Sequence, residues 1–265
     1  MGGNPPEQGE LPPAPRSELA PHMSRGRRIG TCRAESIDGL RMLAGTLVAL
    51  ALVAGCSASS DNDPDKSVPT QADPLAAAVR VEALGCHDTA TIGAGSFVAN
   101  ERVLTAAHVV AGATKIEVRL ADGRRAEAKV TAIDRSLDLA LLDVEQPIAP
   151  LALGSMAVGA TGQYVVYRND AQVALQFRVL ARNPIEVPDL DLLGSSTRDG
   201  YEISATIEPG DSGAVLVSRG VATAMVFARS AQDADRAWAV DIDEIRQLLQ
   251  GDRDVAVDTG ACVPG

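Results

Sequence analysis

The sequence predicts an all-β fold in which two packed barrels are followed by one helix. Apolar residues make up 46% of the 265 residues but aromatic residues only 3%. The core must therefore consist mainly of Val, Leu, Ile and Ala, a mixture that suits strands and small barrels. Short apolar or alternating segments, separated by turn residues, recur along the chain as they do in β-sandwiches and barrels. A stretch with Pro and Gly at 147–162 divides them into two groups of similar size, which favours two barrels.

The predicted elements are short. In the first group we expect strands at 91–99, 102–106, 115–120, 126–133 and 137–144. In the second group we expect strands at 163–167, 172–180, 202–206, 214–218, 221–228 and 237–241. Apolar residues then recur at helical spacing between Asp241, which can serve as an N-cap, and Gly251; they are Ile242, Ile245, Leu248 and Leu249. This pattern predicts one helix near the C-terminal end.

Residues 1–55 are predicted to be a leader that ends in a lipoprotein signal peptide. Several arginines precede the apolar run 42–55, whose fourteen residues are too few to span a bilayer core of about 30 Å but suit a signal peptide. The run ends in Val-Ala-Gly-Cys, which resembles the bacterial lipobox, so we expect lipidation of Cys56. The alternative is an ordinary secretory signal in which Cys56 is incidental. The true start of translation is open between Met1, Met23 and Met42.

After the leader, composition divides the chain into three parts. Residues 56–74 are polar and acidic and are expected to form a disordered tether. The first barrel is assigned to 75–155 and the second, with the helix and the tail, to 156–265. Of the four cysteines, Cys32 would be removed with the leader and Cys56 would carry the lipid. The other two, Cys86 and Cys262, are expected to form a disulfide, because the chain is exported. Two free thiols are the alternative.

Composition and motifs exclude several other classes of function. The net charge of −11 and the isoelectric point near 4.7 argue against nucleic-acid partners. There is no phosphate-binding loop, dinucleotide fingerprint or zinc-ligand spacing, so no cofactor is expected. His87 lies beside Cys86 and Asp88, but no second cluster accompanies it. It is therefore interpreted as a loop histidine, and no metal site is predicted.

Three segments carry residues suited to acyl transfer. His108 lies in TAAHVV, Asp138 begins DLALL, and Ser212 lies in EPGDSG. Cleavage of an acyl bond by this route requires a nucleophile, a base that takes its proton, and a group that orients the base. Asp134 and Asp143 compete with Asp138 for the third role. We favour Asp138 because its leucine-rich surroundings would bury the carboxylate.

The glycines around Ser212 suggest how an oxyanion could be stabilised. Gly210 and Gly213 allow the backbone to turn tightly on both sides of the nucleophile. The N–H groups of Gly210 and Ser212 could then converge on one point. Such a pair of donors forms an oxyanion hole, which is often the largest single contribution to the rate.

The three segments resemble those of the chymotrypsin-like serine proteases, especially short bacterial members, and the resemblance extends from about residue 84 to the end. Some bacterial members also share a stretch similar to 197–213 and a tail similar to 260–263. The resemblance implies two packed antiparallel six-stranded β-barrels with the active site in the cleft between them. It implies that His108 and Asp138 come from the first barrel and Ser212 from the second.

The same resemblance implies a substrate pocket. The family's primary pocket has at its base the residue six positions before the nucleophile, which here is Thr206. Since this side chain is small and neutral, cleavage after Lys or Arg is not expected to dominate. One departure concerns the usual Gly-Asp-Ser-Gly-Gly-Pro, which reads here Gly-Asp-Ser-Gly-Ala-Val. Ala214 adds a methyl group behind the nucleophile.

Two functional hypotheses follow. The first is a serine endopeptidase of the bacterial cell envelope that cleaves proteins or peptides through an acyl-enzyme. A lipid at Cys56 would hold it on the membrane, facing the periplasm or cell-wall space. The second is a catalytically silent, protease-like lipoprotein that binds peptides or partner proteins, and only the change at Ala214 favours it.

Overall fold

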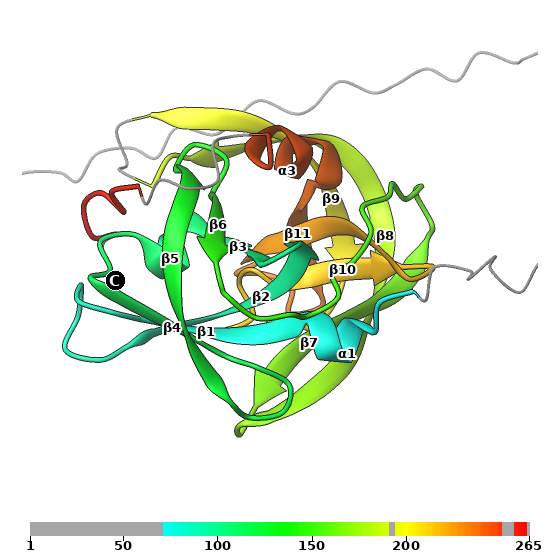
Figure 1. The fold of residues 1–265 in the computed structure, drawn as a ribbon. Helices are drawn as coiled ribbons and strands as arrows, with labels where there is room; N and C mark the ends of the chain where they lie inside the picture. The colour runs from blue at the N-terminus through cyan, green and yellow to red at the C-terminus, as the bar shows by residue number, and fades with distance from the viewer. Residues whose placement is uncertain (1–70, 191–193, 251–256, 264–265) are drawn as a thin grey trace, which may run out of the picture. The chain divides into compact units, whose positions relative to one another are not determined.

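The computed structural model describes residues 71–190, 194–250 and 257–263. The predicted leader, Cys56 and most of the predicted tether lie outside these residues. The described chain forms two closed, six-stranded antiparallel barrels, which confirms the predicted fold class (Figure 1). The domain boundaries themselves remain predictions.

The first barrel follows a short helix and contains a second one. Its strand order is β1-β2-β3-β6-β5-β4, closed by the pairing of β1 with β4. The elements are α1 (Pro74–Ala77), β1 (Ala78–Leu84), β2 (Thr91–Ala99), β3 (Arg102–Ala106), α2 (Ala107–Val110), β4 (Lys115–Arg119), β5 (Arg125–Asp134) and β6 (Leu139–Asp143).

The second barrel has the order β10-β11-β12-β9-β8-β7 and closes between β10 and β7. Its elements are β7 (Thr161–Arg168), β8 (Ala171–Pro188), β9 (Ser195–Ser204), β10 (Val215–Ser218), β11 (Val221–Arg229), β12 (Arg236–Asp241) and the predicted helix α3 (Ile242–Leu248). Asp241 caps α3, because its side chain accepts a hydrogen bond from the Asp243 N–H. No helix in the described ranges is long and apolar enough to cross a membrane.

Small aliphatic side chains fill both barrels, as the composition predicts. The buried cluster of the first barrel is mostly Val, Leu and Ala, and it continues into residues of β10, β11 and α3. This continuity packs the two barrels against each other. In the second barrel two tyrosines are buried as well, and their hydroxyls donate to backbone carbonyls: Tyr164 to Thr206 at 2.9 Å and Tyr201 to Met156 at 3.3 Å. Buried hydroxyl groups are thereby satisfied.

Three elements were not predicted from the sequence. Helices α1 and α2 are single turns of four residues each, too short for a periodic pattern to reveal. Strand β1 shows the expected alternation, since Val79 and Val81 are buried while Arg80 and Glu82 are partly exposed. Its sequence therefore held the signal, although it was not assigned.

The hairpin formed by β8 and β9 is longer than predicted. The sequence predicts strands at 172–180 and 202–206, but β8 continues through Pro184 to Pro188, and β9 begins at Ser195. Beyond the last pair with β7, which joins Thr161 and Arg178, β8 has one free edge. Proline is tolerated on such an edge because no neighbouring strand needs its missing N–H.

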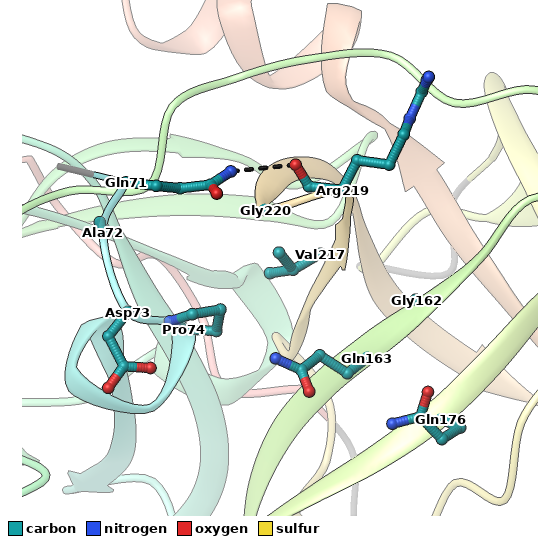
Figure 2. Close-up of a pocket in the computed structure, with 10 residues that line it drawn as sticks. All are labelled: Gln71, Ala72, Asp73, Pro74, Gly162, Gln163, Gln176, Val217, Arg219 and Gly220. Atoms are coloured by element: carbon teal, nitrogen blue, oxygen red, sulfur yellow. Dashed lines mark hydrogen bonds between the residues drawn. The ribbon is translucent and has the colours of Figure 1, made fainter. Parts of the chain in front are cut away.

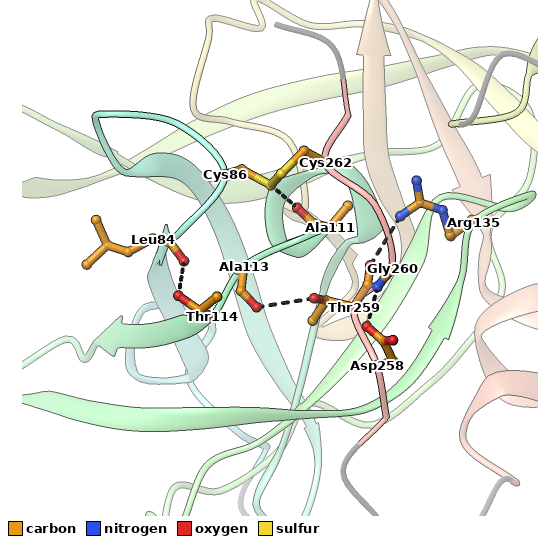
Figure 3. Close-up of a disulfide and its surroundings, with 10 residues drawn as sticks. All are labelled: Leu84, Cys86, Ala111, Ala113, Thr114, Arg135, Asp258, Thr259, Gly260 and Cys262. Carbon is orange, nitrogen blue, oxygen red and sulfur yellow. Dashed lines mark hydrogen bonds between the residues drawn. A yellow bond between two sulfur atoms is a disulfide. The ribbon is translucent and has the colours of Figure 1, made fainter.

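The two cysteines predicted to pair, Cys86 and Cys262, are joined by a disulfide with their Cα atoms 5.5 Å apart (Figure 3). The C-terminal tail lies along the segment that follows α2: Thr259 Oγ1 donates to the Ala113 carbonyl at 3.1 Å, and the Gly112 N–H donates to the Thr259 carbonyl at 3.2 Å. In the loop-entropy model a cross-link over so long a loop stabilises the fold by about 5 kcal/mol. The disulfide therefore fastens the tail directly behind α2.

Candidate active site

His108 and Asp138 form a close pair in the first barrel. His108 lies in α2, two residues after the end of β3, and Asp138 directly precedes β6, which pairs with β3. Nδ1 of His108 lies 2.7 Å from Oδ2 of Asp138, and the His108 backbone N–H donates to Oδ1 at 2.8 Å. The Asp138 side chain is 6% exposed and the His108 side chain 28%. The buried carboxylate of Asp138 thus holds both the ring and the backbone N–H of His108 in one orientation.

The two competing carboxylates have other partners. Asp134 Oδ1 accepts hydrogen bonds from the N–H groups of Ser136 and Leu137, both at 2.9 Å. Asp143 pairs with Arg102 at 2.6 Å. Both side chains are engaged in local structure, whereas the carboxylate of Asp138 faces the histidine.

The environment of His108 sets the direction of its pKa. Burial alone lowers the pKa of the ring, but the hydrogen bond and the negative charge of Asp138 outweigh this effect and raise the pKa above its ordinary value. The positive charge of Arg198 acts in the opposite direction and lowers the pKa of His108. The neutral form, which can act as a base, is therefore lost as the pH falls through this raised pKa.

The backbone of Ser212 lies against the first barrel. Its carbonyl accepts a hydrogen bond of 2.8 Å from the N–H of Ala94, in β2. Gly213 has φ +92°, and a Cβ atom there would lie 2.1 Å from the Ala94 carbonyl oxygen. No other residue could occupy this position without moving the two barrels apart.

The Ser212 side chain is half-buried and makes no hydrogen bond within the described part of the chain. The bond from Ser212 to His108 that a triad requires is thus not formed here. In resting enzymes such bonds are often long and tighten only when substrate binds. Gly210 has φ +95°, a glycine conformation, as the predicted oxyanion turn requires.

Comparison with known proteins matches this geometry to one family. The family model described as "Trypsin-like peptidase domain" matches residues 93–224. The solved structure of the Rv3671c protease from M. tuberculosis, active form, has a TM-score of 0.68 at 30% identity and covers 72% of this chain and 87% of that chain. This chain belongs to the trypsin-like serine protease family.

Curated members of the trypsin-like serine protease family are longer than the matched region. Serine protease Rv3671c from Mycobacterium tuberculosis is 33% identical over 180 residues, covering 64% of this chain and 45% of the relative. Serine protease HTRA2, mitochondrial, from Bos taurus is 34% identical over 154 residues, covering 54% and 33% respectively. The chain therefore spans less than half the length of these relatives.

An ion pair beside Ser212 was missed in the sequence. The carboxylate of Asp211 is fully buried and accepts two hydrogen bonds from the guanidinium of Arg168, one of them 2.5 Å from Nη2 to Oδ2. Asp211 Oδ2 also accepts from the Glu208 N–H at 2.8 Å. The turn that carries the predicted nucleophile is thus anchored to β7. No sequence pattern links Arg168 to a residue 43 positions away.

The departure at Ala214 is accommodated without strain. Ala214 is fully buried in the core of the second barrel. Its N–H donates to the Asp211 carbonyl and its own carbonyl accepts from the Val226 N–H, both at 2.9 Å. Its φ is not among the positive values in the described chain. The extra methyl group therefore does not disturb the turn around Ser212.

The predicted pocket residue has an acidic neighbour. Thr206 is exposed, and its hydroxyl donates to Oδ1 of Asp235, also exposed, at 3.2 Å. Asp235 lies in the loop between β11 and β12, 29 residues along the chain. The prediction of a neutral pocket rests on the Thr206 side chain alone. Because the carboxylate of Asp235 lies beside Thr206, the neutral charge of Thr206 no longer argues against cleavage after Lys or Arg.

Other hollows lie away from these residues. One of about 430 Å³ lies between the segment Gln71–Pro74 and the turn at Arg219 and Gly220, where Gln71 donates to the Arg219 carbonyl at 3.0 Å (Figure 2). His108, Asp138 and Ser212 do not line it. His87 is exposed, and the described residues contain no group of three or more His, Cys, Asp or Glu side chains placed to hold a metal ion.

The Arg168–Asp211 pair yields the first prediction. Arg168→Gln should leave a buried carboxylate unpaired, which costs about 3–5 kcal/mol in such pairs, and should loosen the turn at Ser212. We expect kcat/KM on a peptide substrate to fall at least tenfold and the melting temperature to drop. Arg178→Gln is the matched control, because Arg178 is exposed on β8 and, within the described residues, its side chain hydrogen-bonds only to the Gly159 carbonyl, at 3.4 Å. Equal activity of the two variants would contradict the anchoring role.

Proposed function

We propose that this chain is a serine endopeptidase whose catalytic residues are His108, Asp138 and Ser212. The observation that carries the proposal is the His108–Asp138 pair, in which one buried carboxylate holds both Nδ1 and the backbone N–H of the histidine. The Ser212 turn, fixed from β2 by Ala94 and from β7 by Arg168, supplies the third group. Family membership supports the same chemistry.

The roles follow from the chemistry of acyl transfer. Ser212 Oγ attacks the scissile carbonyl carbon while Nε2 of His108 takes the hydroxyl proton. The N–H groups of Gly210 and Ser212 would bind the oxyanion. His108 then gives its proton to the leaving amine, and the peptide bond breaks to leave an ester on Ser212. Water repeats the sequence and releases the acid, and Asp138 keeps the ring in the required tautomer throughout.

Substitution of the triad tests this proposal. Ser212→Ala and His108→Ala should each lower kcat by several orders of magnitude, and Asp138→Asn by about 10⁴, with the fold preserved. Asp143→Asn is the matched control, since it removes the other competing carboxylate, which pairs with Arg102 and does not face His108. Measured kcat on a peptide substrate checks this. Near-normal turnover by Ser212→Ala would mean that the nucleophile is misassigned.

The substrates that we propose are proteins or peptides, with the primary pocket at Thr206 and Asp235. The Asp235 carboxylate, next to the pocket base, should attract cationic substrate side chains more strongly than a pocket with Thr206 alone would. Asp235→Asn should therefore lower the ratio of kcat/KM for cleavage after Arg to that after Ala about fivefold, as expected for one partly exposed ion pair. Asp199→Asn is the control, because Asp199 is an exposed carboxylate on β9 that contacts neither Thr206 nor Asp235 within the described residues. A ratio unchanged in Asp235→Asn would exclude this residue from the pocket.

We further propose export to the cell envelope and anchoring through a lipid on Cys56. The lipobox and the basic, apolar leader support the proposal, and one relative from Hahella chejuensis, 29% identical, is named a probable periplasmic serine endoprotease. Each buried acyl CH₂ contributes about 0.8 kcal/mol, so two chains give stable attachment.

Replacement of the anchoring cysteine tests this location. Cys56→Ser should abolish labelling by a fatty-acid analogue and release the protein from membranes. Cys32→Ser is the control and should leave labelling intact, because Cys32 precedes the apolar run 42–55. Labelling that persists in Cys56→Ser would rule this cysteine out.

A further inference from the structure

Arg198 is a buried cation that the chemistry proposed above does not use. It lies on β9 in the second barrel and is 2% exposed. The carbon of its guanidinium lies 4.6 Å from the centroid of the Phe227 ring, which provides a favourable cation–π contact in a desolvated place. Burial of a charge is costly without polar partners, so the contacts of Arg198 identify its role.

The polar partners of Arg198 belong to the first barrel. Nη1 donates to the Leu137 carbonyl and Nη2 to the Ser136 carbonyl, both at 2.7 Å. Its Nε has no hydrogen-bond partner within the described chain. The planar fork therefore joins two successive carbonyl groups directly before Asp138, across the interface between the barrels.

The same two residues are held from the other side as well. Asp134 accepts hydrogen bonds from the N–H groups of Ser136 and Leu137, while Arg198 binds their carbonyls. Asp138 itself has φ +57°, a conformation that an L-residue other than glycine adopts only when its surroundings impose it. Because both the N–H groups and the carbonyl groups of residues 136 and 137 are held, the turn imposes this conformation on Asp138.

We propose that Arg198 is a positioning residue that holds the 136–138 turn, and with it the carboxylate of Asp138, against His108. This inference rests on the proposed function, because it assigns a role for that same pair. It makes the orientation of the first-barrel histidine depend on a side chain of the second barrel. The loss of Arg198 should therefore affect catalysis even though Arg198 touches no reacting atom.

The charge of Arg198 provides a second, separate effect. The carboxylates that it faces come from several elements: Asp134, Asp138, Asp189 and Glu244. His108 faces Asp138 and Arg198. Since Arg198 lowers the pKa of His108, removal of its charge should raise that pKa. A loosened Asp138 acts in the opposite direction, because its hydrogen bond and charge raise the pKa of His108.

Three variants separate geometry from charge. Arg198→Met removes both, and we expect kcat to fall at least tenfold with little change in KM, because small misplacements of catalytic groups lower the rate. Arg198→Lys keeps the charge but cannot join both carbonyls, so kcat should fall. Because the contact between Asp138 and His108 loosens while the charge stays, the acid limb of this variant should move to lower pH. Arg182→Met is the control: Arg182 lies on the same hairpin, pairs with Asp241 and does not contact residues 136–138.

A readout independent of turnover distinguishes this inference from the proposed function. In the Ser212→Ala background, NMR titration of His108 should give a lower pKa when Arg198→Lys is added, because the contact with Asp138 loosens, and no change when Arg182→Met is added. A wild type that cleaves nothing contradicts the proposed function. Unchanged kcat in Arg198→Met overturns the role of Arg198. If Arg198→Met does not fold, unchanged kcat and an unchanged His108 pKa in Arg198→Lys overturn it instead.

Discussion

The hydrogen bond from the Ala94 N–H to the Ser212 carbonyl is the contact on which the rest of the site depends. It joins β2 of the first barrel to the turn of the second barrel that carries the predicted nucleophile. Gly213 allows this approach because a side chain there would collide with the Ala94 carbonyl. Neither barrel contains all three of the proposed catalytic residues, so the proposed chemistry requires this backbone contact to be held in place.

Two arginines, far apart in the sequence, hold the turns next to Ser212 and Asp138, on either side of this contact between the barrels. Arg168 fixes the turn next to Ser212 through Asp211, and Arg198 fixes the turn next to Asp138 through two carbonyls. In both cases a planar, permanently charged guanidinium makes two parallel hydrogen bonds, which define an orientation as well as a distance. Packing of a core of small aliphatic residues is not directional. The hydrogen bonds of the two arginines therefore set the orientation of the turns next to Ser212 and Asp138.

The sequence predicted those features that depend on local pattern. The bounds of β2 and β3 agree residue for residue with the expected strands, which are two short, largely apolar segments on either side of the turn at 100–101. The length of the β8–β9 hairpin was underestimated, because the effect of a proline depends on whether the neighbouring edge is paired. The roles of Arg168, Arg198 and Asp235 could not be predicted. Each depends on a contact made between 29 and 62 positions away, which only the folded barrels create.

Labelling with a fluorophosphonate, followed by mass spectrometry of the modified peptide, tests directly whether Ser212 is an activated nucleophile. This reagent reacts with a serine hydroxyl only when a neighbouring base has activated it. We expect a single adduct on Ser212 in the folded protein and none in His108→Ala or Ser212→Ala. Folded wild-type protein that never labels, or an adduct on a different serine, would contradict it.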